Sequence, residues 1–192
     1  MSIVDTVPVG AADGLMESLY ADDARALGYV PSHTLVLALN PGAYAAWRAL
    51  QQAIAASLGL RRYELVTLAA ARSLGSEACL LAHGKKALAV MDRTELLRLL
   101  SGPGYPGLSP AEQAMMVYAA RLCQDSAAMD DADSRTLRDA GFSDTEIVDI
   151  TLAAAARNYF SRALHALAVE PDVPPELDDE LREALLAWPA TG

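Results

Sequence analysis

Alanine and leucine recur at helical spacing through most of this chain, and glycine and proline interrupt the pattern at intervals. Over residues 43–58, AYAAWRALQQAIAASL, apolar residues follow the helical period, which predicts a long amphipathic helix that ends before Gly59. The alternation of Val, Ile and Thr that is typical of strands is scarce. Aromatic residues make up only 6% of the chain, so we expect helices that pack closely through small side chains. The sequence predicts an all-α, multi-helical bundle.

Breaks in the apolar pattern divide the rest of the chain into further predicted helices. Residues 101–110, SGPGYPGLSP, contain three prolines and three glycines, which predicts a loop that could cover a pocket. Capping boxes at Ser109 to Glu112 and Ser143 to Glu146 mark the starts of two later helices. Residues 28–41 are expected to be a connector after an extended N-terminal arm. The further predicted helices span 15–27, 94–100, 110–123 and 146–168, with a short one that ends at Gly141 and an acidic one opened by Pro174 and Pro175.

The length and charge of the chain limit its organisation and its partners. At 192 residues it fits one generous domain, divided into an N-terminal helix and connector (1–42), a central helical domain (43–169) and a C-terminal acidic helix packed on it (170–192). A formal net charge of −10 opposes binding to nucleic acid or to anionic membranes. We expect a small-molecule partner instead. No signal peptide and no long apolar span are apparent, so we expect a cytoplasmic location.

Residues 61–88, RRYELVTLAAARSLGSEACLLAHGKKAL, hold the densest cluster of possible chemistry. A helix over residues 64–72 is expected to end at Gly75, as at a C′ glycine, and Ser76 can cap the next helix with its hydroxyl. Cys79 then takes the third position of that helix. Unpaired N–H groups and the helix dipole favour an anion in the first turn, and the thiolate is the nucleophilic form of cysteine. Cys79 is therefore a candidate nucleophile.

His83 follows Cys79 by four residues, one turn further along the same helix face. Its imidazole can approach the sulfur and take its proton, so the two residues form a possible nucleophile and base pair. A small buried thiol beside a packed histidine remains the structural alternative.

The spacing of these residues resembles the motif of AhpD-like alkylhydroperoxidases and carboxymuconolactone decarboxylases. That motif has a Glu, a Cys-x-x-Cys beginning twelve residues later, and a His four residues after the second Cys. Here the corresponding residues are Glu64, Ser76, Cys79 and His83, and the resemblance covers about residues 43–169. Ser76 stands where the peroxidatic members carry the first Cys. The chain therefore resembles a one-cysteine form of the family.

The resemblance implies an AhpD-like multi-helical bundle and a thiol peroxidase-like oxidoreductase. Cys79 would be the peroxidatic sulfur, Glu64 and His83 would belong to the proton relay, and Ser76 would support the sulfur. An intrahelical disulfide cannot form without a second sulfur, so turnover would need an external thiol reductant, Cys123 or another subunit's cysteine. Members of the family are commonly homo-oligomers, which the small residues Ala153 to Ala156 would permit.

Two other functions stay open. A carboxymuconolactone decarboxylase-like lyase acting on a small lactone or keto acid would use general acids and bases, with Arg61, Arg62 and Arg72 available for a dicarboxylate. A noncatalytic helical oligomer would use the same scaffold. No metal-ligand cluster and no glycine-rich phosphate loop occur, so no metal or other cofactor is predicted.

Other notable side chains have simpler interpretations. Tyr44 and Trp47 could line a substrate pocket but are more simply core residues, His33 is more simply a loop residue, and Cys123 more simply a buried inert thiol. A shift of 82 residues aligns Glu64 with Glu146, Cys79 with Ser161 and His83 with His165. We hypothesise a duplicated helical unit, in which His165 is structural.

Overall fold

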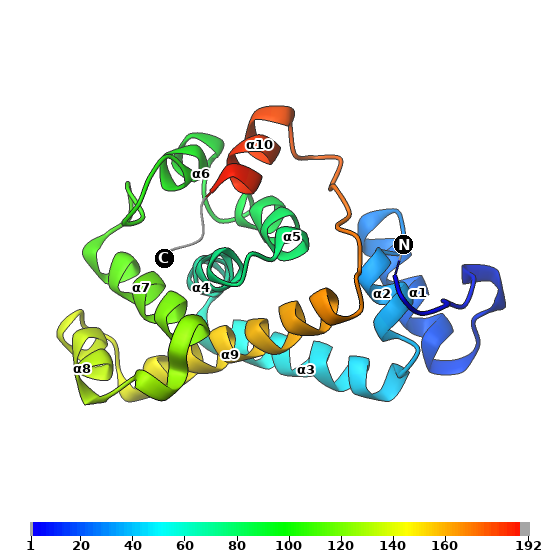
Figure 1. The fold of residues 1–192 in the computed structure, drawn as a ribbon, viewed down its shortest axis with the longest axis horizontal. Coiled ribbons are helices and arrows are strands. Elements are labelled where there is room, and N and C mark those ends of the chain that lie inside the picture. Colours follow the sequence, from blue (N-terminus) through cyan, green and yellow to red (C-terminus); the bar gives the residue numbers. More distant parts are fainter. Residues whose placement is uncertain (1, 189–192) are drawn as a thin grey trace.

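The computed structural model describes residues 2–188, and it confirms the predicted all-α class, with no strand in that part of the chain (Figure 1). The helices are α1 (Gly14–Leu27), α2 (Ser32–Leu37), α3 (Pro41–Leu58), α4 (Leu60–Ser73), α5 (Glu77–Ala87), α6 (Arg93–Leu100), α7 (Pro110–Asp125), α8 (Asp131–Asp139), α9 (Asp144–Ala166) and α10 (Asp179–Ala187), with short 3-10 turns at Val9–Ala11 and Ser126–Ala128.

Helix α4 is the centre of the bundle. It packs against α3, α5, α7 and α9, and Figure 1 shows it nearly end-on with α5 and α7 on either side and α9 beneath. Residues 63–72 are all buried, and six of them are Leu, Val or Ala with no exposed surface. Helices α4 and α9 are in contact, and both bury small apolar side chains.

Most predicted helix boundaries agree with the structure to within a few residues. The Ser109 and Ser143 capping boxes are both confirmed, since each hydroxyl accepts from the N3 backbone N–H and each N3 glutamate accepts from the cap backbone N–H. The loop is confirmed over residues 101–109, and Pro110 is the first residue of α7.

Three structural predictions were wrong. The connector at 28–41 contains the short helix α2, which begins directly after Pro31. The last helix begins at Asp179 instead of at the prolines, because the Asp178 carboxylate accepts from the Leu181 N–H and caps it there. The duplicated unit also fails: residues 64–83 form two helices broken at Gly75, whereas residues 146–165 lie within the single helix α9.

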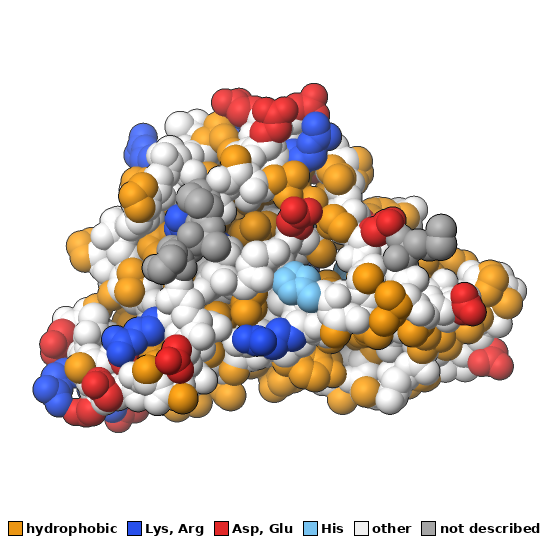
Figure 2. All heavy atoms as spheres, in the orientation of Figure 1, with side chains coloured by type: hydrophobic (Ala, Val, Ile, Leu, Met, Phe, Trp, Pro, Cys, Tyr) orange, Lys and Arg blue, Asp and Glu red, His pale blue; other side chains and the backbone are white. Residues whose placement is uncertain are grey.

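The acidic charge of the chain's end lies on the outer face of α10. Asp178, Asp179 and Glu180 are exposed, and Figure 2 shows acidic side chains gathered over this helix. Arg93 pairs with Asp178 and Glu180 and joins α10 to α6. None of the helices within residues 2–188 is long and apolar enough to cross a membrane.

Gly84 is a helical glycine at the contact between α5 and α10. A Cβ added there would lie 2.4 Å from Leu185 Cδ1, and Leu185 is fully buried. We expect Gly84→Ala to lower the free energy of unfolding by about 1 kcal/mol, because overpacking exceeds the gain in helix propensity. Chemical denaturation measures this. Gly42→Ala, in the open first turn of α3, is the matched control and should be neutral or stabilising; an equally stable Gly84→Ala variant contradicts the predicted clash.

Candidate active site

The turn between α4 and α5 places Cys79 where the sequence predicts it. Gly75 has a φ of +62°, and the Ser76 and Gly75 N–H groups donate to the Ala71 and Arg72 carbonyls, which ends α4 in a Schellman motif. Ser76 is the N-cap of α5, so Cys79 occupies the third position of the helix. The predicted hydroxyl cap is wrong: Ser76 Oγ makes no capping bond and is buried without a partner among the described residues.

Glu64 and His83 form a buried pair beside the cysteine. Glu64 Oε2 lies 2.6 Å from His83 Nδ1, and both side chains are at most 3% exposed. Burial raises the pKa of Glu64 to about 7, against the smaller opposing influence of Lys86 and Arg157. Burial also holds the pKa of His83 well below its usual value, and the nearby cations add to this. The histidine is therefore a neutral base whose orientation Glu64 fixes.

The polar contacts of Cys79 come from α9. Ser161 Oγ lies 3.3 Å from Cys79 Sγ, and Arg157 Nη1 donates to the sulfur at 3.5 Å. The expected direct contact between His83 and the sulfur is absent from the described hydrogen bonds, because Arg157 and Ser161 take the polar positions around it. His83 and Cys79 instead line one cavity.

Arg157 is an unusual partner for a thiol. Its side chain is 2% exposed, and its guanidinium lies over the Trp47 and Phe160 rings at 5.8 and 5.3 Å. No carboxylate within residues 2–188 is at ion-pair distance from it. Burial lowers the pKa of Arg157, but Cys79, Tyr63 and Glu64 outweigh that effect and raise it. Cys79 and Tyr63 are therefore the groups that lie against this buried guanidinium, and Cys79 Sγ accepts from its Nη1.

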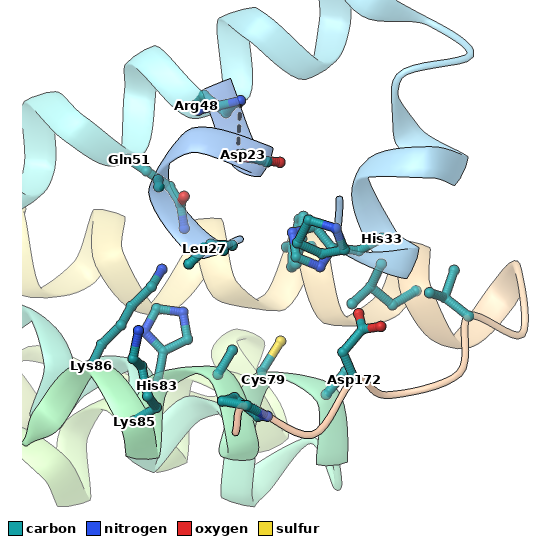
Figure 3. A pocket seen from close by; sticks show the side chains of 18 of the residues that line it. Asp23, Leu27, His33, Arg48, Gln51, Cys79, His83, Lys85, Lys86 and Asp172 are labelled. Atoms are coloured by element: carbon teal, nitrogen blue, oxygen red, sulfur yellow. Dashed lines mark ion pairs between the residues drawn. The ribbon is translucent and has the colours of Figure 1, made fainter. Parts of the chain in front are cut away.

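A cavity of about 360 Å³ opens above Cys79, His83 and Lys86. Figure 3 shows these three side chains rising from α5 toward the opposite wall, where Gln51 and His33 are labelled. The volume lies within the range of small-molecule sites. The cavity lining includes residues of α1, α2, α3, α5 and α9 and of the segment 169–176.

The aromatic residues that sequence analysis favoured as core are also walls of this cavity. Trp47 and Tyr44 are buried and both line it, and the Trp47 ring stacks on Phe160 with centroids 4.0 Å apart. His33, favoured as a simple loop residue, lies on α2 and also faces the cavity, edge-on to Phe160. Burial, with Lys86, Arg157 and Arg48, lowers the pKa of His33 to about 3, so it is neutral at physiological pH.

Several other candidate residues lie away from the cavity. Arg61 pairs with Glu95 and Glu112, and Arg62 pairs with Glu146. Arg72 lies over the Trp188 ring at 4.4 Å.

None of these three arginines lines the cavity, so they are not placed to bind a dicarboxylate there.

Cys123 is buried with its thiol directed at the Ala154 carbonyl, and burial raises its pKa to about 11. His165 is exposed on α9 and lies outside the cavity.

Sequence reasoning missed Arg157, Ser161 and Lys86. The shift of 82 residues did align Ser161 with Cys79, and these two side chains are in contact. Arg157 lies four residues before Ser161, on the same face of α9.

Comparisons with known proteins agree with this architecture. Residues 41–101 match the model of the carboxymuconolactone decarboxylase family. The structure is similar to an uncharacterised peroxidase-related protein with an alkylhydroperoxidase AhpD core from Ralstonia eutropha, with a TM-score of 0.80 and 20% identity over 97% of each chain.

Two further solved structures are similar over most of the chain. A peroxidase-related protein from Silicibacter sp. TM1040 has a TM-score of 0.75 and 25% identity, covering 89% of this chain and 92% of its own. The debrominase Bmp8, in a cysteine-to-alanine variant bound to 2,3,4-tribromopyrrole, has a TM-score of 0.73 and 17% identity over 95% of each chain. No curated protein sequence matches this chain.

Proposed function

We propose that this protein is a peroxidase-related oxidoreductase in which Cys79 reduces small hydroperoxides. The match of residues 41–101 to the carboxymuconolactone decarboxylase family and the AhpD-like fold support this proposal. The observation that carries the proposal is the buried contact from Arg157 Nη1 to Cys79 Sγ. A guanidinium that donates to the sulfur can stabilise the negative charge of the attacking nucleophile, and the thiolate is the form of cysteine that attacks a peroxide.

The groups around Cys79 supply each part of the reaction. His83, oriented by Glu64, takes the thiol proton through a bound water. The thiolate then attacks the terminal peroxide oxygen, and the O–O bond breaks as the new S–O bond forms. The alkoxide leaving group takes the proton back from the His83 imidazolium. The products are a Cys79 sulfenic acid and an alcohol.

The second half of the cycle needs a thiol from outside the chain. Ser76 has no sulfur, and Cys123 does not line the cavity. An external thiol attacks the sulfenic sulfur and releases water, which leaves a mixed disulfide; a second external thiol then frees Cys79 and departs as a disulfide.

A test of the proposal is steady-state peroxide consumption with hydrogen peroxide, an organic hydroperoxide and a small external thiol. Consumption that depends on both the peroxide and the thiol supports the proposal. An inactive protein whose Cys79 is unmodified by peroxide contradicts it.

A lyase remains the second candidate, because Lys86 and Arg157, the two cations of the cavity lining that have no ion pair among the described residues, would suit a carboxylated lactone. Lactone turnover that survives loss of the thiol would favour it. Halogenated aromatic rings belong in the same substrate panel, since the flat wall of Trp47 and Phe160 is suited to a ring such as the one bound by the debrominase.

The protonation of Glu64 is expected to control the rate of sulfenic acid formation. Its pKa of about 7 means that raising the pH through neutrality ionises the carboxylate, which then stabilises the His83 imidazolium. The rate should therefore rise with pH around this value. Glu64→Gln should slow the reaction about 100-fold, the usual effect of losing acid–base assistance, and should remove this step of the profile. Rapid-quench labelling between pH 5 and about 9 measures it.

Glu77→Gln is the matched control, because Glu77 is exposed in the first turn of α5 and is outside the cavity lining. It should keep the wild-type profile. If Glu64→Gln keeps it as well, the carboxylate has no part in the proton relay.

A further inference from the structure

The polar groups left without partners around the cavity are hydrogen-bond donors. Trp47 Nε1 and Arg157 Nε are buried and make no hydrogen bond with the described residues. Both side chains are at least nine-tenths buried, and both line the cavity. A buried donor without an acceptor costs free energy, which a ligand with acceptor oxygens would recover.

Lys86 adds a third donor and a charge. It lines the cavity, and Figure 3 shows its side chain directed into it beside His83. Within residues 2–188 its ammonium has no ion pair, in contrast to its neighbour Lys85, which pairs with Glu176 at 3.1 Å. Lys86 is exposed to solvent and also lines the cavity, so its ammonium can meet a bound ligand without being paired inside the protein first.

Three of the acidic residues around the cavity are already engaged elsewhere. Asp23 accepts from Thr34 and pairs with Arg48. Asp172 accepts from the Ser32 N–H and hydroxyl, both at 2.8 Å. Glu176 is the partner of Lys85 described above. None of these three carboxylates forms an ion pair with Lys86, and Glu64 and Asp23 act on its charge only from beyond ion-pair distance. A ligand carboxylate could therefore be the direct partner of Lys86.

The body of the cavity is apolar and partly flat. The stacked rings of Trp47 and Phe160 form one wall, and Tyr44 continues it with its ring centroid 6.0 Å from that of Trp47. Leu27, Ala82 and Leu164 add aliphatic surface. A ligand that fills this volume thus needs an apolar body as well as an anionic end.

We infer that the cavity selects a small carboxylate with an aromatic or aliphatic body, whose carboxylate is bound by Lys86. If the proposed function holds, on which this consequence rests, the substrate is a carboxylated hydroperoxide whose peroxide group lies at Cys79 Sγ.

Binding can be measured without the redox chemistry. Isothermal titration with benzoate and with benzamide compares a carboxylate with a neutral molecule of the same shape. Wild type and Cys79→Ala should both bind benzoate about tenfold more tightly than benzamide, a difference that corresponds to one charge-assisted hydrogen bond. Lys86→Met should lose this preference, while Lys85→Met should keep it. Circular dichroism confirms that each variant is folded.

Equal binding of benzoate and benzamide to wild type overturns the inference, as does a preference that survives in Lys86→Met. A kinetic comparison of cumene hydroperoxide with its para-carboxylate then separates the two proposals. A preference in binding without any peroxide turnover retains the carboxylate site and removes the peroxidase function. Peroxide turnover without any preference for the carboxylated peroxide, and without any preference for benzoate in binding, retains the peroxidase function and removes the carboxylate site.

Discussion

Arg157→Met is expected to slow the reaction of Cys79 with hydroperoxides by about 100- to 1000-fold, the usual effect of removing one donor that stabilises charge in a reaction. Methionine fills much of the same volume but gives the sulfur no positive neighbour. The second-order rate constant of sulfenic acid formation, measured under rapid-quench conditions, tests this. Arg157 is 2% exposed and Nη1 lies 3.5 Å from the sulfur, so solvent does not replace it easily.

Thermal unfolding of the same variant distinguishes a chemical role from a structural one. Arg157 has no carboxylate partner among the described residues, so Arg157→Met removes a buried charge without leaving a carboxylate unpaired, and the melting temperature should not fall. Arg157→Lys keeps a charge and should retain more of the activity than Arg157→Met. A variant that loses stability and reactivity together would instead mean that Arg157 mainly supports the packing of α9 against α3 and α4.

Cys79→Ser is expected to remove peroxide turnover entirely, because a hydroxyl at this position is not a competent nucleophile toward peroxide at neutral pH. Its stability should change little, since serine is close in size to cysteine and its hydroxyl can take over the hydrogen bonds that Arg157 and Ser161 make with the sulfur. Peroxide consumption with an external thiol in excess measures the effect.

Cys123→Ser is the matched control for that experiment. Its thiol is buried against the Ala154 carbonyl, and its raised pKa of about 11 keeps it protonated. Turnover should therefore persist in this variant. Loss of turnover in Cys123→Ser, with sulfenic acid formation intact, would assign Cys123 as the resolving thiol and contradict the need for an external one.

The local part of the site could be predicted because short-range rules determine it. Gly75 adopts a positive φ after α4, and this fixes the start of α5 and the place of Cys79 in its first turn. The association of Glu64 with His83 is expected only from the family resemblance, and the two side chains do pair, from neighbouring helices. The all-α class followed from the helical periodicity of apolar residues.

The rest of the site depends on packing between distant segments. Arg157 and Ser161 lie 78 and 82 residues after Cys79, and only the packing of α9 beside α5 brings them to its sulfur. The residues next to Arg157 in the sequence do not distinguish it from an arginine on the surface. The placement of His33 and Trp47 in the cavity wall required the positions of α2 and α3 in the same way.

The most direct test of the central claim is the rate at which hydrogen peroxide and an organic hydroperoxide convert Cys79 to a sulfenic acid. Dimedone-type trapping followed by mass spectrometry locates the modified residue, and free cysteine in the same buffer gives the reference rate. The account predicts labelling at Cys79 at least about 100-fold faster than at free cysteine, since oriented donors and a base act together on the sulfur. Labelling at Cys79 no faster than the reference would contradict it.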